Sequence, residues 1–382
     1  MPAERLMPDN ESRMLIDMVR DFANNVMRPQ VDEMEANSEL PREVFRQLGE
    51  LGLLSLAYPE EYGGGGQPYE VYLQVVEEIA TAWMSVAVGV SVHSLTINPV
   101  YAFGTDEQKE RMLHDMLGGT QLGAYALSEP DAGSDVANIQ TAAVKAGDQY
   151  RLTGTKQWIS HAGHADFYTT FARTSDDGPR GLSCFIVPAG AEGMSFPPPE
   201  RKMGLDSDTV GQVVFNDAPI DADRMIGKEG QGMSIALSAL DNGRLGIAAC
   251  ATGLAQAALD CAVQYSQERE QFGRKIAEFQ GLAFLLADME AAVTSARATY
   301  LHAARMKDAG KPAGKLASVA KLICTDAAMK VTTDAVQVLG GVGYTKDFPA
   351  ERFMREAKVT QIFEGTNQIQ RLVISRQLLA GH

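Results

Sequence analysis

The sequence contains little cysteine and little histidine. Its four cysteines and six histidines are spread over 382 residues, with no Cys-x-x-Cys pair and no His-Glu-x-x-His motif. His161 and His164 lie close together, but they stand among glycine and alanine without a matching cluster of cysteines or acids. We therefore predict no metal site, and we interpret the cysteines as buried thiols of a protein from a reducing compartment.

Long apolar runs and an excess of positive charge are also missing. No apolar run reaches the ~18 residues that a membrane span needs, because serine, histidine and asparagine interrupt the richest stretch, 85–100. The first residues, MPAERLMPDN, carry acids and lack the apolar core of a signal peptide. The formal net charge of -15 argues against a nucleic-acid partner, since phosphate backbones favour clustered lysine and arginine. These absences predict a cytoplasmic protein without a membrane span.

What the sequence does contain falls into three successive patterns. Residues 10–110 have helical spacing of apolar side chains, and the chain from residue 232 onward forms long amphipathic runs rich in alanine, leucine and methionine. Between them lie short β-rich runs separated by glycine, aspartate and proline, with no long helix and no Gly-x-Gly-x-x-Gly fingerprint. This order predicts an α+β multidomain fold with a helical domain (1–120), a sheet or barrel (121–232) and a helical bundle (233–382).

Two stretches of the β-rich region could border a ligand. ALSEPDAGSD (126–135) is explained most simply as a turn of proline, aspartate and glycine. KQWISHAG (156–163) holds Trp158, one of two tryptophans, followed by Ser160. Trp158 is either part of the core or one wall of a site for a planar heteroaromatic ligand, to which nearby hydroxyls would donate hydrogen bonds.

Two further stretches lie at breaks between the C-terminal helices. In SQEREQFGRKIAEFQG (266–281), Arg269, Arg274 and Lys275 surround an aromatic residue and a glycine. This pattern is typical of a solvated helix end, but in so acidic a protein it also fits a site for pyrophosphate and adenine. QVLGGVGY (337–344) is either a glycine cap of a helix or a place where bare amides let a phosphate approach.

The stretch TQIFEGTNQIQR (360–371) contains a single carboxylate, Glu364. Thr366 or Asn367 would cap the helix that follows. Glu364 could be a plain surface acid near the positive end of that helix. Its neighbours Ile362 and Phe363 instead predict apolar surroundings, which would raise the pKa of the carboxyl toward the range useful to a general base.

Taken together, these stretches resemble the acyl-CoA dehydrogenase family. The resemblance covers about residues 10–380, and FEGTNQIQR combined with LSEPxAGSD, WIS and QFGR in this order is a specific signature. The likeness is greatest to the short-chain and branched short-chain members. It implies that the central domain is a β-barrel, that the C-terminal domain is a four-helix bundle, and that the protein is a homotetramer built from two dimers.

The resemblance further implies that FAD binds between barrel and bundle. The residues that match the family's isoalloxazine contacts, with Ser160 near the reactive nitrogen, are Tyr125, Leu127, Ser128, Gly133, Ser134, Trp158, Ile159 and Ser160. A second group of residues matches the family's contacts to the pyrophosphate and adenosine of FAD, which are made across the dimer interface. This group, which includes sequence neighbours of the matching positions, is Arg269, Gln271, Phe272, Gln280, Gln337, Val338, Gly340 and Gly341. Thr366 and Gln368 match further flavin contacts.

The same resemblance implies a substrate and a reaction. Ser134, Gly365 and the segment from Asp241 to Arg244 match the acyl-CoA contacts, and Glu364 matches the catalytic base. Some branches place the base just before the arginine that corresponds to Arg244. This chain has glycine at that position, which leaves Glu364 as the only candidate. The implied reaction removes the α-proton of an acyl-CoA thioester while a hydride leaves the β-carbon for flavin N5, giving a trans-2-enoyl-CoA, and electrons then pass to an electron-transfer flavoprotein.

Two departures from the family pattern stand near the flavin motifs. Asp131 occupies a position where glycine is common, and Ser160 with His161 replaces the frequent Thr-Asn pair. Serine keeps the hydroxyl, so hydrogen bonding to the flavin should survive, whereas His161 could change the polarity of the pocket.

Other activities on the same scaffold are less compatible with these residues. Acyl-CoA oxidases usually carry an extra C-terminal domain, and this sequence stops shortly after the helix that follows Glu364. Flavin monooxygenases and nitroalkane oxidases usually lack this glutamate or use aspartate. A non-catalytic flavin- or CoA-binding relative would be expected to lose the base or the flavin motifs, and both are present in this chain.

Overall fold

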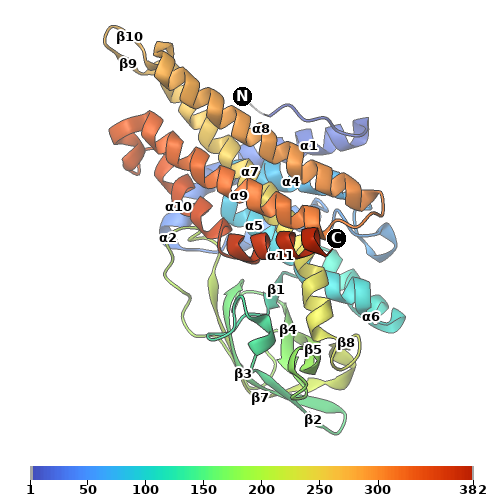
Figure 1. Ribbon diagram of the computed structural model, residues 1–382. Coiled ribbons are helices and arrows are strands. Elements are labelled where there is room, and N and C mark those ends of the chain that lie inside the picture. Colours follow the sequence, from blue (N-terminus) through green and yellow to red (C-terminus); the bar gives the residue numbers. More distant parts are fainter. Residues whose placement is uncertain (1–2, 381–382) are drawn as a thin grey trace.

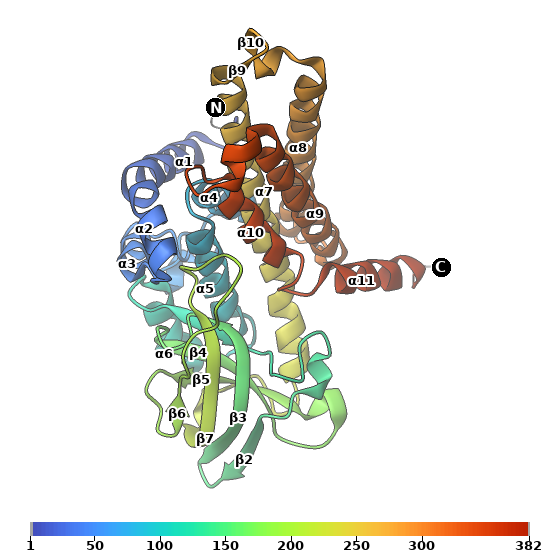
Figure 2. The ribbon, with the colours of Figure 1, turned by 90° about the vertical axis from the view of Figure 1, so that its left-hand side faces the viewer.

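The computed structural model describes residues 3–380, in which helices, a sheet and further helices follow one another. Figure 1 shows the sheet in the lower part of the molecule and the helices above it. The long helix α7 (Gly232–Glu268) begins beside the sheet and runs to the opposite end of the helical part. Figure 2 shows the same arrangement from the side. The predicted α+β architecture is confirmed.

Helices fill the region before the sheet, as the apolar spacing predicts. Asp9 begins the first of them by accepting a hydrogen bond from the N–H of Ser12 at 2.7 Å. Thr105 and Gln108 form a capping box at the start of the last. These helices are α1 (Asn10–Phe22), α2 (Val31–Asn37), α3 (Arg42–Glu50), α4 (Tyr69–Ala82), α5 (Met84–Phe103) and α6 (Asp106–Leu117).

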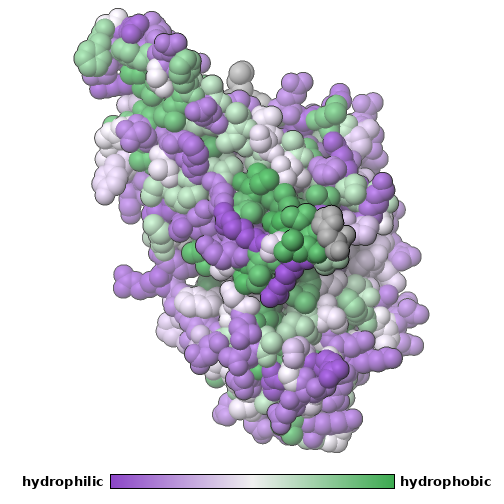
Figure 3. Space-filling model, in the orientation of Figure 1, coloured by the Kyte–Doolittle hydropathy of each residue, from purple (hydrophilic) through white to green (hydrophobic). Residues whose placement is uncertain are grey.

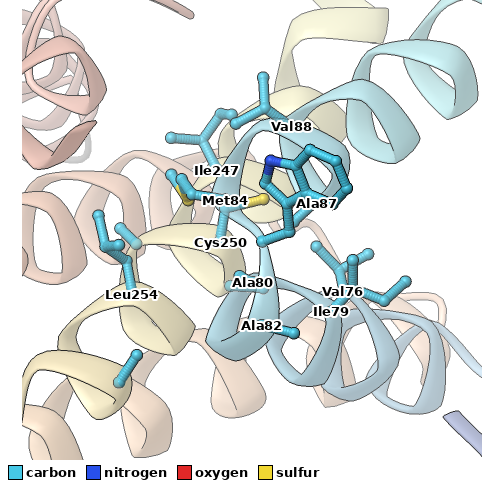
Figure 4. Close-up of a cluster of buried hydrophobic side chains, with 14 of the residues drawn as sticks. Val76, Ile79, Ala80, Ala82, Met84, Ala87, Val88, Ile247, Cys250 and Leu254 are labelled. Carbon is cyan, nitrogen blue, oxygen red and sulfur yellow. The ribbon is translucent and has the colours of Figure 1, made fainter. Parts of the chain in front are cut away.

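The main core lies where α4, α5 and α7 meet. Figure 4 shows Val76 and Ile79 of α4, Val88 of α5, and Ile247 and Leu254 of α7 among the side chains of this cluster. Both α5 and α7 have the length and composition of a membrane span, but 83% of the apolar window of each is buried inside the protein. They are core helices of the fold.

The polar residues that interrupt the apolar run of α5 are buried. The ring of His93 is fully buried: its Nδ1 accepts a hydrogen bond from the N–H of Gly123 at 3.0 Å, and Nε2 lies 3.1 Å from the carbonyl oxygen of Met116. Burial lowers the pKa of His93 to about 3, so the ring is neutral. These bonds tie α5 to the start of the sheet.

The cysteines are only partly as predicted. Cys184, Cys250 and Cys324 are buried, free thiols, whereas Cys261 on α7 is half-buried. Burial raises the pKa of Cys261, so the thiol form dominates at neutral pH.

The β-rich runs form one mainly antiparallel sheet. Its strands are hydrogen-bonded in the order β6-β7-β3-β2-β4-β5-β8, and β1 pairs in parallel with β4. Two runs that the sequence separates, 150–154 and 156–160, are one strand, β3, whose register against β7 is irregular at two points. The strands are β1 (Gly123–Ala126), β2 (Ala142–Ala146), β3 (Gln149–Ser160), β4 (Phe167–Arg173), β5 (Leu182–Pro188), β6 (Met194–Ser195), β7 (Val210–Asp221) and β8 (Met225–Ile226).

Of the helices that follow α7, the second packs along α7, and the other three pack mainly on that second helix. A small hairpin of β9 (Glu270–Gln271) and β10 (Arg274–Lys275) joins α7 to the next helix. The last helix stands apart from the body in Figure 2, and among its described residues only Asn367 and Gln370 are buried. The helices after α7 are α8 (Gln280–Asp308), α9 (Gly314–Leu339), α10 (Ala350–Thr360) and α11 (Asn367–Leu379).

Candidate active site

The predicted base lies in the turn between α10 and α11. Glu364 has a φ of 54° and Gly365 a φ of 85°, so both residues adopt the left-handed conformation. A glutamate in this region is strained, and such residues cluster at functional sites. Thr366 ends the turn by capping α11: its Oγ1 accepts a hydrogen bond from the N–H of Ile369 at 3.2 Å. This confirms the predicted cap.

The turn directs the side chain of Glu364 against α7 at Gly243. A Cβ atom added to Gly243 would lie 2.5 Å from Oε2 of Glu364 and 3.0 Å from its Cδ. The glycine therefore leaves the space that the carboxyl group occupies. The helix position from which other family branches are expected to supply a base is, in this chain, the position against which the carboxyl group of Glu364 lies.

The carboxyl group of Glu364 has few polar neighbours. Its Oε2 is buried and has no hydrogen-bond partner, although the residue as a whole is partly exposed. Burial raises the pKa of Glu364 to about 7, and the cations Arg244 and Lys321 oppose this rise. Of the two apolar sequence neighbours, Ile362 is 53% exposed, whereas Phe363 packs against the main core.

Arg244, which follows Gly243 on α7, is a second element of the site. Its side chain is buried, and Nη1 donates a hydrogen bond to Oδ1 of Asp241 at 2.7 Å. The Nε–H of Arg244 is buried without a partner. A buried guanidinium with a free donor can bind an acceptor atom of a ligand.

Lys321 on α9 is a residue that the sequence analysis missed. Its fully buried ammonium group donates hydrogen bonds to the carbonyl oxygen of Gly365 at 2.8 Å and to Oδ1 of Asn367 at 2.9 Å. A signal was available, because this lysine falls on the apolar stripe of α9, between Ala317 and Cys324. Buried lysines are rare unless paired, so a lysine on such a stripe indicates a specific partner.

The segments that follow β1 and precede the end of β3 lie side by side. The N–H of Gln157 donates to the carbonyl oxygen of Ser128 at 2.9 Å. Below this contact, the buried Lys156 forms an ion pair with Glu129 at 2.7 Å. Glu129 also accepts from the N–H of Thr141 at 2.9 Å. The buried side chain of Glu129 thus fixes the turn at residues 128–130. The predicted contact residues Gly133 and Ser134, which follow this turn, are exposed.

Tyr125 on β1 links these segments to α7. Its hydroxyl donates to the carbonyl oxygen of Ala236 at 3.3 Å, and its ring packs on Phe171. Burial, with a smaller contribution from the charge of Glu364, raises the pKa of Tyr125. Tyr125 therefore ties the start of the sheet to α7 at Ala236, on the same helix as Gly243, against which Glu364 lies.

Trp158 is not a core residue. It is 59% exposed and has a φ of 63°, at the second irregularity of β3. The hydroxyl of Ser160 donates to Oδ2 of Asp208 at 2.9 Å. Burial raises the pKa of Asp208 to about 6, and its Oδ1 has no partner. An exposed indole near a fixed hydroxyl can form one wall of a site for a planar ligand.

The two departures from the family pattern have different surroundings. His161 is fully buried, its Nδ1 lies 2.9 Å from the carbonyl oxygen of Gly123, and its ring meets that of Phe45 edge-on. Burial lowers its pKa to about 4, so it adds no charge. The side chain of Asp131 is exposed, and only its carbonyl accepts a bond, from Asn138.

A second group of predicted cofactor residues lies at the far end of the helices. Arg269 follows the last residue of α7, 26 positions beyond Gly243, which corresponds to roughly 40 Å at the ~1.5 Å rise of an α-helix. Both Figure 1 and Figure 2 place the β9–β10 hairpin at the end opposite the sheet. Phe272 in this hairpin is 94% exposed, and Gly340 caps α9 with a φ of 64°. Within a single chain, these residues, together with Gln280 and Gln337, therefore lie far from Glu364.

Comparison with known proteins agrees with this architecture. Models of the acyl-CoA dehydrogenase N-terminal, middle and C-terminal domains match residues 9–120, 124–218 and 230–379. A short-chain specific acyl-CoA dehydrogenase of Clostridium acetobutylicum is 42% identical over 96% of this chain and 98% of its own. The butyryl-CoA dehydrogenase structure from Megasphaera elsdenii is 39% identical with a TM-score of 0.96, over 98% of this chain and 100% of its own.

A third similar protein is a chain in a structure described as an electron transferring flavoprotein of Acidaminococcus fermentans. It is 43% identical with a TM-score of 0.96, over 99% of this chain and 100% of its own. The three-part fold and the high identity to these dehydrogenases over nearly the whole chain define an oxidoreductase that acts on CH–CH donors. The chain belongs to the acyl-CoA dehydrogenase family.

Proposed function

We propose that this protein oxidises a short acyl-CoA thioester to the trans-2-enoyl-CoA with FAD as its cofactor. The observation that carries the proposal is the carboxyl group of Glu364, which lies against Gly243 with a free Oε2 and a pKa of about 7. A general base works best when its pKa is close to the working pH. Short-chain specificity is supported by the two relatives named short-chain specific and butyryl-CoA dehydrogenase.

Glu364 takes the α-proton of the thioester in this proposal. An α-proton next to a thioester is weakly acidic, so the site must also stabilise the negative charge that develops on the carbonyl oxygen. The backbone N–H of Glu364 is a candidate donor to that oxygen, and the strained turn would hold the amide and the carboxyl group in fixed relation. Arg244, with its unpartnered Nε–H, is assigned to the CoA side of the substrate.

FAD, when bound, supplies the ring that accepts the β-hydrogen as a hydride. The residues present fit a flavin: Trp158 is exposed beside Ser160, and the 128 and 157 segments are hydrogen-bonded to each other. Tyr125, Leu127, Ile159, Gly133 and Ser134 would line the same wall, and Thr366 and Gln368 would add contacts from α11. The electron acceptor is proposed to be an electron-transfer flavoprotein, which the likeness to the Acidaminococcus fermentans chain supports.

A homotetramer is proposed because a single chain leaves both apolar surface and cofactor residues unused. On α11, Leu372, Leu378 and Leu379 are 41%, 56% and 71% exposed. Figure 3 shows hydrophobic surface gathered over this part of the molecule and again at the β9–β10 hairpin. In a dimer, the hairpin and the end of α9 would complete the partner's FAD site.

The function is tested by mixing the purified yellow protein with butyryl-CoA without oxygen. We expect the visible flavin absorbance to bleach and an electron-transfer flavoprotein to restore it. A ladder of straight and branched acyl-CoAs should show the fastest bleaching for short chains. A colourless protein, or hydrogen peroxide as the main product in air, would contradict the proposal in favour of a silent relative or an oxidase.

Replacing Arg269 with alanine should weaken FAD retention without touching Glu364. A hydrogen bond to a charged group contributes ~1.5–3 kcal/mol, so we expect FAD to bind roughly 10- to 100-fold more weakly. The ratio of FAD to protein after dialysis measures this. Arg13→Ala, on the exposed face of α1, is the matched control. Equal flavin content in both variants would remove Arg269 from the cofactor site.

A further inference from the structure

The turn that carries Glu364 is held from one side by a buried lysine. The ammonium group of Lys321 donates to the carbonyl oxygen of Gly365 at 2.8 Å and to Oδ1 of Asn367 at 2.9 Å. Gly365 is the second of the two consecutive left-handed residues, and Asn367 is the first residue of α11. The lysine therefore forms hydrogen bonds to the residues on both sides of the cap residue Thr366.

Asn367 also forms hydrogen bonds to other residues of α9. Its Nδ2 donates to Oγ1 of Thr325 at 2.9 Å and to Oδ1 of Asp326 at 2.7 Å. The side chain of Gln361, at the end of α10, donates to the same Oδ1 at 2.7 Å. Both ends of the turn are thus bound to one face of α9, which is itself a rigid part of the core.

We propose that Lys321 is a positioning residue for the base, which fixes the strained turn through Gly365 and Asn367 and places a positive charge beside the carboxyl group of Glu364. This inference rests on the proposed function of Glu364. Holding the non-glycine residue Glu364 in the left-handed conformation costs free energy, and the buried hydrogen bonds of the ammonium group to its turn offset that cost.

The charge of Lys321 also acts on the carboxyl group directly. It lowers the pKa of Glu364, against the larger effect of burial, and Glu364 in turn raises the pKa of Lys321, which burial brings down to about 7. Each group stabilises the charged form of the other. The other titratable groups that interact with Glu364 are Arg244 and Cys250 of α7, Tyr69 of α4 and Tyr125 of β1.

Lys321→Met tests both parts of the proposal. The substitution leaves the carbonyl of Gly365 with a donor, because Nε2 of Gln370 also bonds it at 2.9 Å, so the holoenzyme should still fold. We expect faster amide hydrogen exchange over residues 361–370. Loss of the charge should raise the pKa of Glu364, so the acid limb of the bleaching rate should move to higher pH by roughly one unit.

Two further variants separate the charge from the hydrogen bonds. Lys321→Gln removes the charge but keeps a donor, so its pH profile should shift as in the methionine variant while exchange rises less. Thr325→Val loosens Asn367 without changing charge, so its pH profile should stay in place. If the methionine variant does not retain FAD, the glutamine variant supplies the pH measurement.

An unchanged pH profile and unchanged exchange over 361–370 in the two lysine variants would overturn this inference. That result is distinguishable from failure of the proposed function. If Glu364→Gln bleaches normally, the base assignment itself is wrong. If Glu364→Gln is inert while the lysine variants behave like the parent protein, only the role of Lys321 is wrong.

Discussion

Glu364→Gln should give a yellow protein that butyryl-CoA no longer bleaches. Glutamine keeps the size of the side chain and its fit against Gly243, but it cannot take a proton. Loss of a general base typically costs a factor of ~10²–10⁴ in rate, and we expect the upper part of that range because Glu364 is the only carboxyl group in this turn. Stopped-flow measurement of flavin absorbance without oxygen gives the rate.

A second buried glutamate provides the control for this variant. Burial raises the pKa of Glu356 on α10 to about 7, as it does for Glu364. Glu356 is fully buried and accepts a hydrogen bond from Arg352 at 3.1 Å, so no substrate can reach it. Glu356→Gln should therefore bleach at the normal rate. Equal loss of bleaching in both variants would show that the effect of Glu364→Gln is structural.

Glu364→Gln should not lower the free energy of unfolding at neutral pH. The carboxyl of an unfolded chain loses its proton near pH 4.5, whereas folded Glu364 keeps it until about pH 7. The native state therefore binds more protons across this interval, and the contribution of Glu364 to stability falls as the pH rises through it. Glutamine removes this penalty. The thermal midpoint of Glu364→Gln at pH 8 should equal or exceed that of the parent protein.

Gly243→Ala should lower activity while leaving the fold intact. The new Cβ would lie 2.5 Å from Oε2 of Glu364, closer than atoms approach, so the flexible end of the glutamate must move. A misplacement of ~1 Å at a reacting group can cost a factor of ~10² in rate. Alanine is also a better helix former than glycine by ~0.8–1.0 kcal/mol, so stability should hold or rise.

This opposition of rate and stability distinguishes a displaced base from a damaged core. Bleaching rate and thermal midpoint are measured together, with Ser234→Ala in the exposed first turn of α7 as the control. The control gains helix propensity without approaching Glu364, so its rate should not change. A Gly243→Ala protein of normal rate would mean that the carboxyl group does not work from its position against α7.

Structural features that depend on residues close together in the sequence were predicted correctly. The helix cap at Thr366, the glycine cap at Gly340 and the β-rich runs follow from side chains that act on their own backbone or on the next strand. Where a distant element decides, the sequence left alternatives open or gave no prediction. It left two interpretations of Trp158, and the register of β3 against β7 accompanies an exposed side chain. It gave no role to Lys321, because the hydrogen bonds of this lysine require α9 to lie beside the turn after α10.

By itself, the order of residues determined the alternation of helical and β-rich regions, the family signature and the identity of the single acid in FEGTNQIQR. Periodicity, capping and motif order depend on the linear order of residues, so they can be recognised in the sequence without the tertiary structure. Only the tertiary structure decided that Gly243 makes room for that acid, that Arg244 and Lys321 oppose the rise of its pKa, and that Arg269 lies at the opposite end of the helices from the Glu364 of its own chain. Burial and electrostatic contact join residues that are far apart in the sequence, and these contacts exist only once α7, α9 and the turn before α11 are packed together.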